Sequence, residues 1–345
     1  MKKVLGPFLA LLVSGAALAG TVALNPNHPS RHVVVKGDTL WGIATRFLRD
    51  PWLWPDIWYV NPQIKNPHLI YPGDVISLVY VGGKPQLRLQ RRAAVSAAPS
   101  GVEVLQPRVR VEPLPKAIPT IPLDAIEPFL NRSMVASEAE LRNAPYIVEN
   151  GGEHVVAGTG NTVYVRGIHT RRDFRYTVVH PGPAYRDPVT HEILGYQALY
   201  VGSARVERFG NPATLMLTRS HMEAAIGDRL LPAEHERFNP NFFPHAPSHP
   251  VQGTIIAVLG GVSQIGQLNT VVLNVGRRNG MKVGDVLAVY QAGPVVRDQV
   301  KGGTVKLPDE RAGVLIVYRI FDRVSYGLVM QATRALHVLD KVRNP

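Results

Sequence analysis

The N-terminal part of the chain begins with a short apolar run and then changes to helical spacing. Residues 32–35 read His-Val-Val-Val, and apolar side chains recur at positions 40, 43, 44 and 47. This pattern predicts a strand followed by a helix that buries one face, with Asp38 or Thr39 as the N-cap. A second helix is expected over about 55–61, because Pro55 suits the first helical position. Turn signals at 66–67 and 71–74 then lead into a closing strand, Val75 to Leu78.

The pattern changes twice after this module, which is assigned to residues 31–81. Prolines recur over 82–122 without helical or strand periodicity, which predicts a semi-rigid linker that tethers the module without packing it on the C-terminal half. Helical spacing returns over 123–145, where one or two short helices are expected, including residues 133–137. From 146 onward, short β-branched and aromatic runs are bounded by Gly, Pro, Asn and Asp, which is typical of antiparallel sheets or small barrels.

A weak internal repeat divides this β-rich half. Gly182-Pro-Ala-Tyr-Arg-Asp187 is echoed by Gly293-Pro-Val-Val-Arg-Asp298, and each half closes on an Asp followed by a basic and an aliphatic residue. We therefore expect two related β units, 146–232 and 250–345, joined by an exposed loop at 233–249. The predicted fold is multidomain: a small α+β module with βααβ order, a Pro-rich linker, and a mainly-β region of two units.

The first 19 residues have the features of a cleavable signal peptide. Lys2 and Lys3 precede an apolar stretch over 5–16, and Ala17-Leu18-Ala19 is an A-x-A cleavage site. The apolar stretch is too short for a transmembrane helix, and the absence of cysteine removes both disulfides and lipidation. We expect a periplasmic protein associated with the cell wall and the outer membrane.

Charge narrows the choice of partners. Removal of the leader would leave 36 basic and 26 acidic residues, a net charge of +10. This balance favours an acidic partner, such as cell-wall carboxylates, lipid headgroups or an acidic protein face, or else is a merely solvated basic surface. Nucleic acid is a poor candidate, because export would separate the protein from it and the sequence contains no basic-aromatic recognition motif.

Residues 32–80 resemble the LysM module, through Gly-Asp-Thr-Leu at 37–40 and Asn-Pro…Tyr-Pro-Gly-Asp at 66–74. The resemblance implies binding of N-acetylglucosamine-containing glycan, which means peptidoglycan in an exported bacterial protein. In that family the ligand lies in a shallow groove between two loops, held largely by backbone groups. The implied glycan-binding residues are Gly37, Asp38, Thr39, Leu40, Asn66, Pro67, His68, Leu69 and Ile70. Gly37 would let backbone approach the sugar, and Leu69 and Ile70 would give an apolar floor, although Gly37 and Asp38 also simply make a turn.

All four tryptophans lie inside this module. Trp41 and Trp58 are expected to fill the small core between helices and sheet, rather than to stack on sugar rings. Trp52 and Trp54 lie in the connection between the two helices. For them, core packing and contact with the wall or a partner remain equal alternatives.

Sequence signals for catalysis are weak. Without cysteine there is no thiol nucleophile, and neither Ser-x-x-Lys nor Gly-x-Ser-x-Gly occurs. The His-Glu pairs at 191–192 and 235–236 lack a second helical His, and Pro247 argues against a helix presenting both His245 and His249. Paired carboxylates for glycan hydrolysis remain open, because spacing alone does not exclude them. We expect no enzyme activity, no metal and no cofactor.

The ensemble of motifs resembles the family of type IV pilus secretin-associated proteins, TsaP, which joins an N-terminal LysM module to a FlgT-like β region. The matching phrases are Ile121-Pro-Leu-Asp-Ala-Ile-Glu-Pro-Phe-Leu, Ala144-Pro-Tyr-Ile-Val, Val163-Tyr-Val-Arg-Gly, Tyr185-Arg-Asp-Pro, Gly195-Tyr and Ile226-Gly-Asp-Arg-Leu-Leu-Pro. The resemblance implies a non-catalytic tether that grips peptidoglycan and contacts an outer-membrane secretin, and several copies in a ring would gain avidity. A scaffold for another envelope machine, or a wall hydrolase with its site in the β half, are the alternatives.

Overall fold

The computed structural model describes residues 22–59, 69–91, 117–152, 155–169, 174–233, 242–260 and 264–345. The expected signal peptide, residues 92–116 of the expected linker, and Asn66, Pro67 and His68 of the implied glycan site lie outside these residues. In the part of the chain that is described, no helix combines the length and apolar character needed to cross a membrane.

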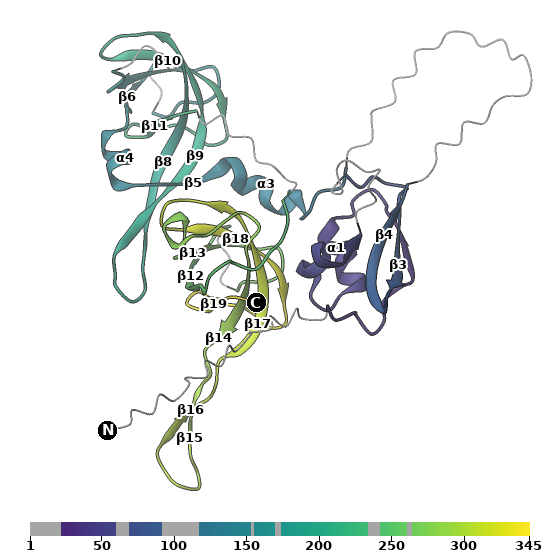
Figure 1. Ribbon diagram of the computed structural model, residues 1–345. Helices are drawn as coiled ribbons and strands as arrows, with labels where there is room; N and C mark the ends of the chain where they lie inside the picture. Colours follow the sequence, from purple (N-terminus) through teal and green to yellow (C-terminus); the bar gives the residue numbers. More distant parts are fainter. Residues whose placement is uncertain are drawn as a thin grey trace, which may run out of the picture.

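The N-terminal module contains two helices packed on a four-stranded sheet (Figure 1). Its elements are β1 (Arg31–Val33), α1 (Leu40–Phe47), the 3-10 turn η1 (Pro51–Leu53), α2 (Trp54–Ile57), β2 (Trp58–Tyr59), β3 (Val75–Val81) and β4 (Lys84–Gln90), with strand order β1-β3-β4-β2. The expected βααβ order is present, and Leu40, Ile43, Ala44 and Phe47 of α1 are buried as the spacing predicts.

Two details of this module differ from the sequence prediction. Helix α2 ends at Ile57 instead of continuing to 61, because Trp58 and Tyr59 pair with Leu87 and Arg88 as a parallel strand. That partner strand, β4, lies in the stretch expected to be linker. Leu87 and Leu89 of β4 alternate with exposed polar residues and are buried in the module core, so the strand period was present but short.

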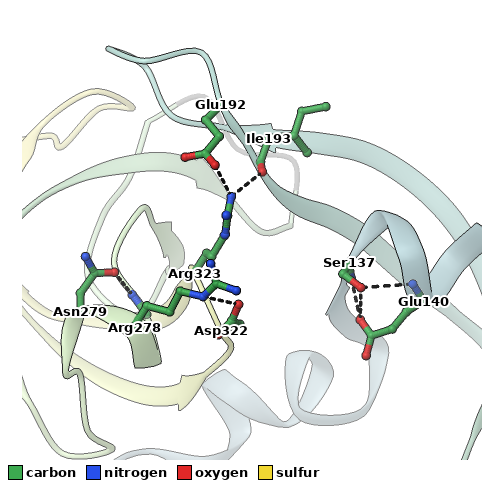
Figure 2. A network of polar contacts seen from close by, with 9 residues as sticks. Ser137, Glu140, Glu192, Ile193, Arg278, Asn279, Asp322 and Arg323 are labelled. Atoms are coloured by element: carbon green, nitrogen blue, oxygen red, sulfur yellow. Dashed lines mark hydrogen bonds and ion pairs between the residues drawn. The ribbon is translucent and has the colours of Figure 1, made fainter.

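A helical connection leads to the β-rich half. It contains α3 (Leu123–Arg132), β5 (Ser133–Ala136) and α4 (Glu138–Asn143). Helix α4 begins at a capping box, in which Ser137 Oγ accepts from Glu140 N and Glu140 Oε2 accepts from Ser137 N (Figure 2). The helix expected over 133–137 is wrong: residues 133–136 are an edge strand, because they pair with Tyr196 to Leu199 of β9.

Six strands form a first barrel. They are β6 (Tyr146–Asn150), β7 (Thr162–Arg166), β8 (Arg175–Arg186), β9 (Ile193–Arg208), β10 (Ala213–Ser220) and β11 (Arg229–Pro232). The sheet order β10-β7-β6-β11-β8-β9 closes through pairing of β9 with β10, and β5 extends it at β9. All of these pairings are antiparallel.

Six further strands form a second, closed barrel with the order β12-β13-β18-β17-β14-β19. The elements of this region are β12 (Gln252–Val258), β13 (Thr270–Leu273), η2 (Arg277–Asn279), β14 (Val286–Gln291), β15 (Val295–Arg297), β16 (Thr304–Lys306), β17 (Glu310–Ile320), β18 (Ser325–Ala332) and β19 (Lys341–Arg343). Strands β15 and β16 make a separate two-stranded hairpin (Figure 1). The described part of the expected 233–249 loop, after residue 241, has no helix and no strand longer than a single bridge at His245.

The second barrel has apolar side chains on both faces of its wall. Leu315 and Val317 of β17 face the interior core, whereas Val314, Ile316 and Tyr318 belong to a second buried cluster on the outside. Helix α3, the tip of the β8–β9 hairpin, and Trp41 of the N-terminal module cover that outer cluster. The expectation that the module is only tethered is therefore wrong, because Trp41 is buried in the same apolar cluster as Val314, Ile316 and Tyr318 of the barrel.

Candidate glycan-binding site

The first loop of the implied groove is a turn closed by Asp38. Asp38 Oδ2 accepts from Val35 N at 3.0 Å and lies 2.8 Å from His32 Nε2, while Gly37 has φ +97°. Thr39, not Asp38, is the N-cap of α1, since its Oγ1 accepts from Gly42 N at 3.0 Å. This arrangement leaves the first amides of α1, Leu40 N and Trp41 N, without partners inside the helix.

The second loop contributes Leu69 and Ile70 among its described residues. Asp74 Oδ2 accepts from Tyr71 N at 3.0 Å, and Val34 N donates to Asp74 O at 2.8 Å. These bonds fix the second loop beside the end of β1. Leu40 of the first loop and Ile70 of the second are both buried in the module core.

A segment of the chain itself, residues 117–121, lies between the two loops. Ile118 N donates to Ile70 O at 2.8 Å, Leu40 N donates to Pro119 O at 3.0 Å, and Trp41 N donates to Thr120 O at 3.0 Å. Ile118 is buried with Leu40 and Ile70 in the module core. The backbone groups implied as glycan ligands at positions 40 and 70 are thus already hydrogen-bonded within the protein.

The same segment connects the groove to the second barrel. Thr120 Oγ1 donates to Phe242 O at 2.9 Å, and Ile121 packs with Trp41 in the outer cluster of the barrel. Sequence reasoning placed these residues at the end of a linker. A Pro-rich segment carries no periodic signal that would show what its backbone pairs with.

The tryptophans are distributed differently from the sequence expectation. Trp41 is buried in the interface with the barrel, whereas Trp58 is half-buried against the module core. Trp54 is fully buried in that core, 5.5 Å from the ring of Phe243, and Trp52 packs against the outer cluster. For Trp52 and Trp54 the packing alternative is therefore the correct one.

The electrostatics of the groove centre on Asp38. Burial alone would raise the pKa of Asp38, but the Val35 amide, the His32 side chain and the charge of Arg46 together lower it below its usual value. The carboxylate is therefore held ionised, and it closes the turn of the first loop by accepting from Val35 N. Because this carboxylate closes the loop that the resemblance implies as part of the site, a substitution here reports folding as well as binding.

The remaining chemical candidates are engaged in structural contacts. His245 Nδ1 lies 3.0 Å from Asp285 Oδ1, and His249 Nε2 lies 2.7 Å from Asn279 O, so each ring joins the described loop to the second barrel. Among the described residues, no three His, Cys, Asp or Glu side chains gather in a way that could hold a metal ion.

Comparison with known proteins bears on the module alone. A family model described as the LysM domain matches residues 32–79. A search of curated proteins gives no match to this chain. The matched range begins in β1 and ends in β3, so it contains both loops of the groove and both helices. Residues 32–79 are a LysM domain.

Proposed function

We propose that this protein is a non-catalytic peptidoglycan-binding protein of the bacterial periplasm that tethers or stabilises an outer-membrane secretin of the type IV pilus. The observation that carries the proposal is the LysM domain, a binding module for N-acetylglucosamine-containing glycan. The secretin part is supported by the resemblance of the β-half phrases, such as Tyr185-Arg-Asp-Pro, to the TsaP family.

Glycan binding at this groove requires displacement of residues 117–121. The segment uses Leu40 N and Ile70 O, so a sugar that needs these groups competes with it directly. The apparent affinity for glycan then falls by the fraction of molecules in which the groove is open. Because Thr120 and Ile121 also contact the barrel side, displacement would loosen the LysM domain from the barrel.

Sedimentation of the mature chain, residues 20–345, with purified sacculi tests the peptidoglycan part. We expect retention of the unaltered protein, and about tenfold tighter retention for Ile118→Asp, which weakens the competing segment. Ile118→Val is the matched control. Since Ile118 is buried in the LysM core, Thr120→Ala provides a second variant that removes only the bond to Phe242. If neither the unaltered protein nor the variants sediment with sacculi, the peptidoglycan assignment is wrong.

Hydrogen exchange gives an independent view of the groove. Chito-oligosaccharide should increase the exchange of amides in residues 117–126 while protecting those of residues 37–41. Glycan binding without any change in residues 117–126 would show that the sugar uses a different surface, and the competition would be rejected.

Capture from detergent-solubilised envelopes tests the secretin part. The full mature chain is the appropriate bait, because residues 123–345 alone would uncover the apolar barrel face that Trp41 occupies. Recovery of the pilus secretin supports the tether, and recovery of a flagellar or other secretin would favour the scaffold alternative. Release of soluble muropeptides from sacculi would instead favour the hydrolase alternative.

A further inference from the structure

The two barrels share one strand topology. Numbering the six strands of each barrel in chain order, the closed order is 1-2-5-4-3-6 in both, since β6-β7-β10-β9-β8-β11 matches β12-β13-β18-β17-β14-β19. The registers match as well. Thr162–Val165 pairs with Ala213–Met216 in the first barrel as Thr270–Leu273 pairs with Ser325–Leu328 in the second. Positions can therefore be compared residue by residue.

Each barrel has a hairpin between its third and fourth strands. We call residues 182–194 the first hairpin and residues 293–305 the second hairpin. Asp187 Oδ1 accepts from Val189 N and Thr190 N, and Asp298 Oδ1 accepts in the same way from Val300 N and Lys301 N. The backbone bonds that close both turns are equivalent too. The two tips are therefore copies of one structure.

The first hairpin is docked on the outer face of the second barrel. Tyr185 is 6% exposed and, with Leu194, belongs to the outer cluster that contains Tyr326. Asn274 Nδ2 donates to Asp187 Oδ2 at 2.8 Å. Figure 2 shows Arg323, whose Nη1 donates to Glu192 Oε1 at 2.6 Å and to Ile193 O at 3.2 Å. An apolar patch and a polar tip together make this contact.

The second hairpin carries the same apolar positions without a cover. Val296 and Val305 replace Tyr185 and Leu194, and they are 39% and 48% exposed, while Val300 at the tip is 93% exposed. Both strands are exposed along their whole length, and the hairpin projects away from the barrel (Figure 1). A two-stranded hairpin exposed on all sides is only marginally stable in water, so this one is suited to docking.

The first barrel, in turn, has a receiving face that is not fully covered. Val272, Tyr326 and Leu328, which lie beneath the first hairpin and its neighbours, are completely buried. Their counterparts by register, Tyr164, Thr214 and Met216, are only half-buried. Arg166 stands at the position of Asn274, and it is exposed. An arginine here offers a charged partner to an aspartate at the tip of a hairpin.

We propose that the second hairpin docks on the outer face of the first barrel of a second copy of this chain. Val296 and Val305 would cover Tyr164, Thr214 and Met216, and Asp298 would meet Arg166 as Asp187 meets Asn274. Because the hairpin and its receiving face are different surfaces, the contact is head-to-tail, and copies join into a closed ring or an open filament. The inference does not depend on glycan binding.

Cysteine cross-linking tests the contact directly, because the chain contains no cysteine. The variants Val296→Cys and Thr214→Cys place thiols at the counterparts of Tyr185 and Tyr326. Mixing the two mature proteins under mild oxidation should give a cross-linked heterodimer about tenfold faster than mixing Val296→Cys with the control Lys84→Cys, an exposed site on β4. Equal rates in the two mixtures would mean random collision and would overturn the proposal.

Sedimentation velocity provides the second readout and needs no peptidoglycan. At about 0.15 M salt, where repulsion between basic copies is screened beyond about 8 Å, the mean mass should rise with protein concentration. Val296→Asp should raise the protein concentration at which the mean mass begins to rise by about tenfold or more. The melting temperature should not change, because Val296 is exposed within one chain.

Three outcomes contradict the proposal. A mass that stays monomeric at all concentrations rejects self-association. Association that survives Val296→Asp places the interface elsewhere. If Val296→Asp abolishes capture of an envelope protein while the mass remains monomeric, the hairpin binds that protein and not a second copy.

Discussion

Five aspartates close the same four-residue turn at distant places in the chain. In each turn the carboxylate accepts from the amide three residues earlier, and the Asp amide donates to the carbonyl of that same residue. The aspartates are Asp38, Asp74, Asp228, Asp285 and Asp340. The residue before Asp has positive φ and is glycine in four turns, but it is Leu339, at φ +79°, in the fifth. Leu339 is thus the one strained member of this set.

Leu339→Asn should stabilise the second barrel. Asparagine tolerates the left-handed region, and Leu339 is largely exposed, so the change removes strain of about 1 kcal/mol with little lost packing. The free energy of unfolding from urea titration of the mature chain measures this gain. Gly227→Ala, at φ +94° with open space around its Cα, is the reverse experiment and should cost about 1 kcal/mol. A loss of stability in Leu339→Asn would contradict the strain argument.

The lowered pKa of Asp38 predicts acid sensitivity of the LysM domain. A carboxyl whose folded pKa lies below its unfolded value of about 3.9 contributes stability above that value. This contribution is lost as the pH falls through the folded pKa. All four tryptophans lie in this domain, so their fluorescence during urea unfolding reports on the domain and, through Trp41 and Trp52, on its contact with the second barrel. Asp38→Asn should flatten the loss of stability between about pH 5 and pH 2, and an unchanged slope would assign the acid sensitivity to other groups.

At the scale of elements, the two hairpins show that one motif can have two environments. Gly-Pro-x-x-Arg-Asp begins both tips, and the turn hydrogen bonds are equivalent. Tyr185 is nevertheless buried, whereas Val296 at the matching position is exposed. Burial here depends on whether a second barrel is within reach of the hairpin.

Truncation at these matching positions should therefore give unequal results. Tyr185→Ala removes a buried aromatic ring from the outer cluster and should cost about 3 kcal/mol, with faster hydrogen exchange at the tip of the first hairpin. Val296→Ala should change the unfolding free energy by less than about 0.5 kcal/mol in dilute, monomeric protein. Similar losses from the two variants would mean that the second hairpin is also packed within its own chain.

Local elements could be predicted where the cause lies in neighbouring residues. Helix α1, its Thr39 cap as one of two candidates, the turn at 71–74 and the internal repeat all follow from short-range patterns. Strand β5 could not be placed in this way, because it has four residues and owes its conformation to pairing with β9. Strand β4 did carry local signals, the Gly82-Gly83 turn that joins it to β3 and the alternation at Leu87 and Leu89, but the recurring prolines of this stretch favoured a linker.

At the scale of the whole molecule, the second barrel is the body on which the other parts pack. Its outer cluster receives Trp41 from the LysM domain, Ile126 from α3 and Tyr185 from the first hairpin. The pair Arg311–Asp50, at 3.6 Å, adds an exposed contact between the barrel and the LysM domain. Two tryptophans of the LysM domain reach this cluster, and Trp41 is buried there whereas Trp52 is half-buried, so Trp41 should contribute most to how firmly the domain is held.

Trp41→Ala should release the LysM domain from the barrel. Loss of a buried indole typically costs about 3–5 kcal/mol, which exceeds what an exposed ion pair can supply. Small-angle X-ray scattering of the mature chain should show a larger radius of gyration. Arg46→Ala, on an exposed position of the same helix, is the control and should scatter like the unaltered protein. An unchanged radius for Trp41→Ala would show that the remaining contacts, made by residues 117–121, Trp52 and the Arg311–Asp50 pair, are enough to hold the domain.

Only the two loops that border the candidate site could be predicted from the sequence, because their turn and cap residues are close in sequence. The segment that lies between the loops, residues 117–121, could not. Ile118 meets Ile70 and Leu40 across a long Pro-rich stretch with no periodicity. The interface with the barrel was missed for a related reason: Trp41 lies next to the core face of α1, and a helical pattern alone does not distinguish two different buried surfaces.

The double-sided burial of the second barrel limits how its sequence can vary. Along β10 of the first barrel, buried and half-buried residues alternate from Ala213 to Leu217, so every other position can accept polar side chains. Along β17, Ala312 to Tyr318 are all buried, so none of these positions can accept a polar side chain without cost. Saturation mutagenesis should therefore find that tolerance to polar substitutions alternates from one residue to the next over 213–217. Over 312–318 it should find low tolerance at every position. The second barrel would then be the slowest-changing part of the protein, although the candidate glycan-binding groove lies in the LysM domain.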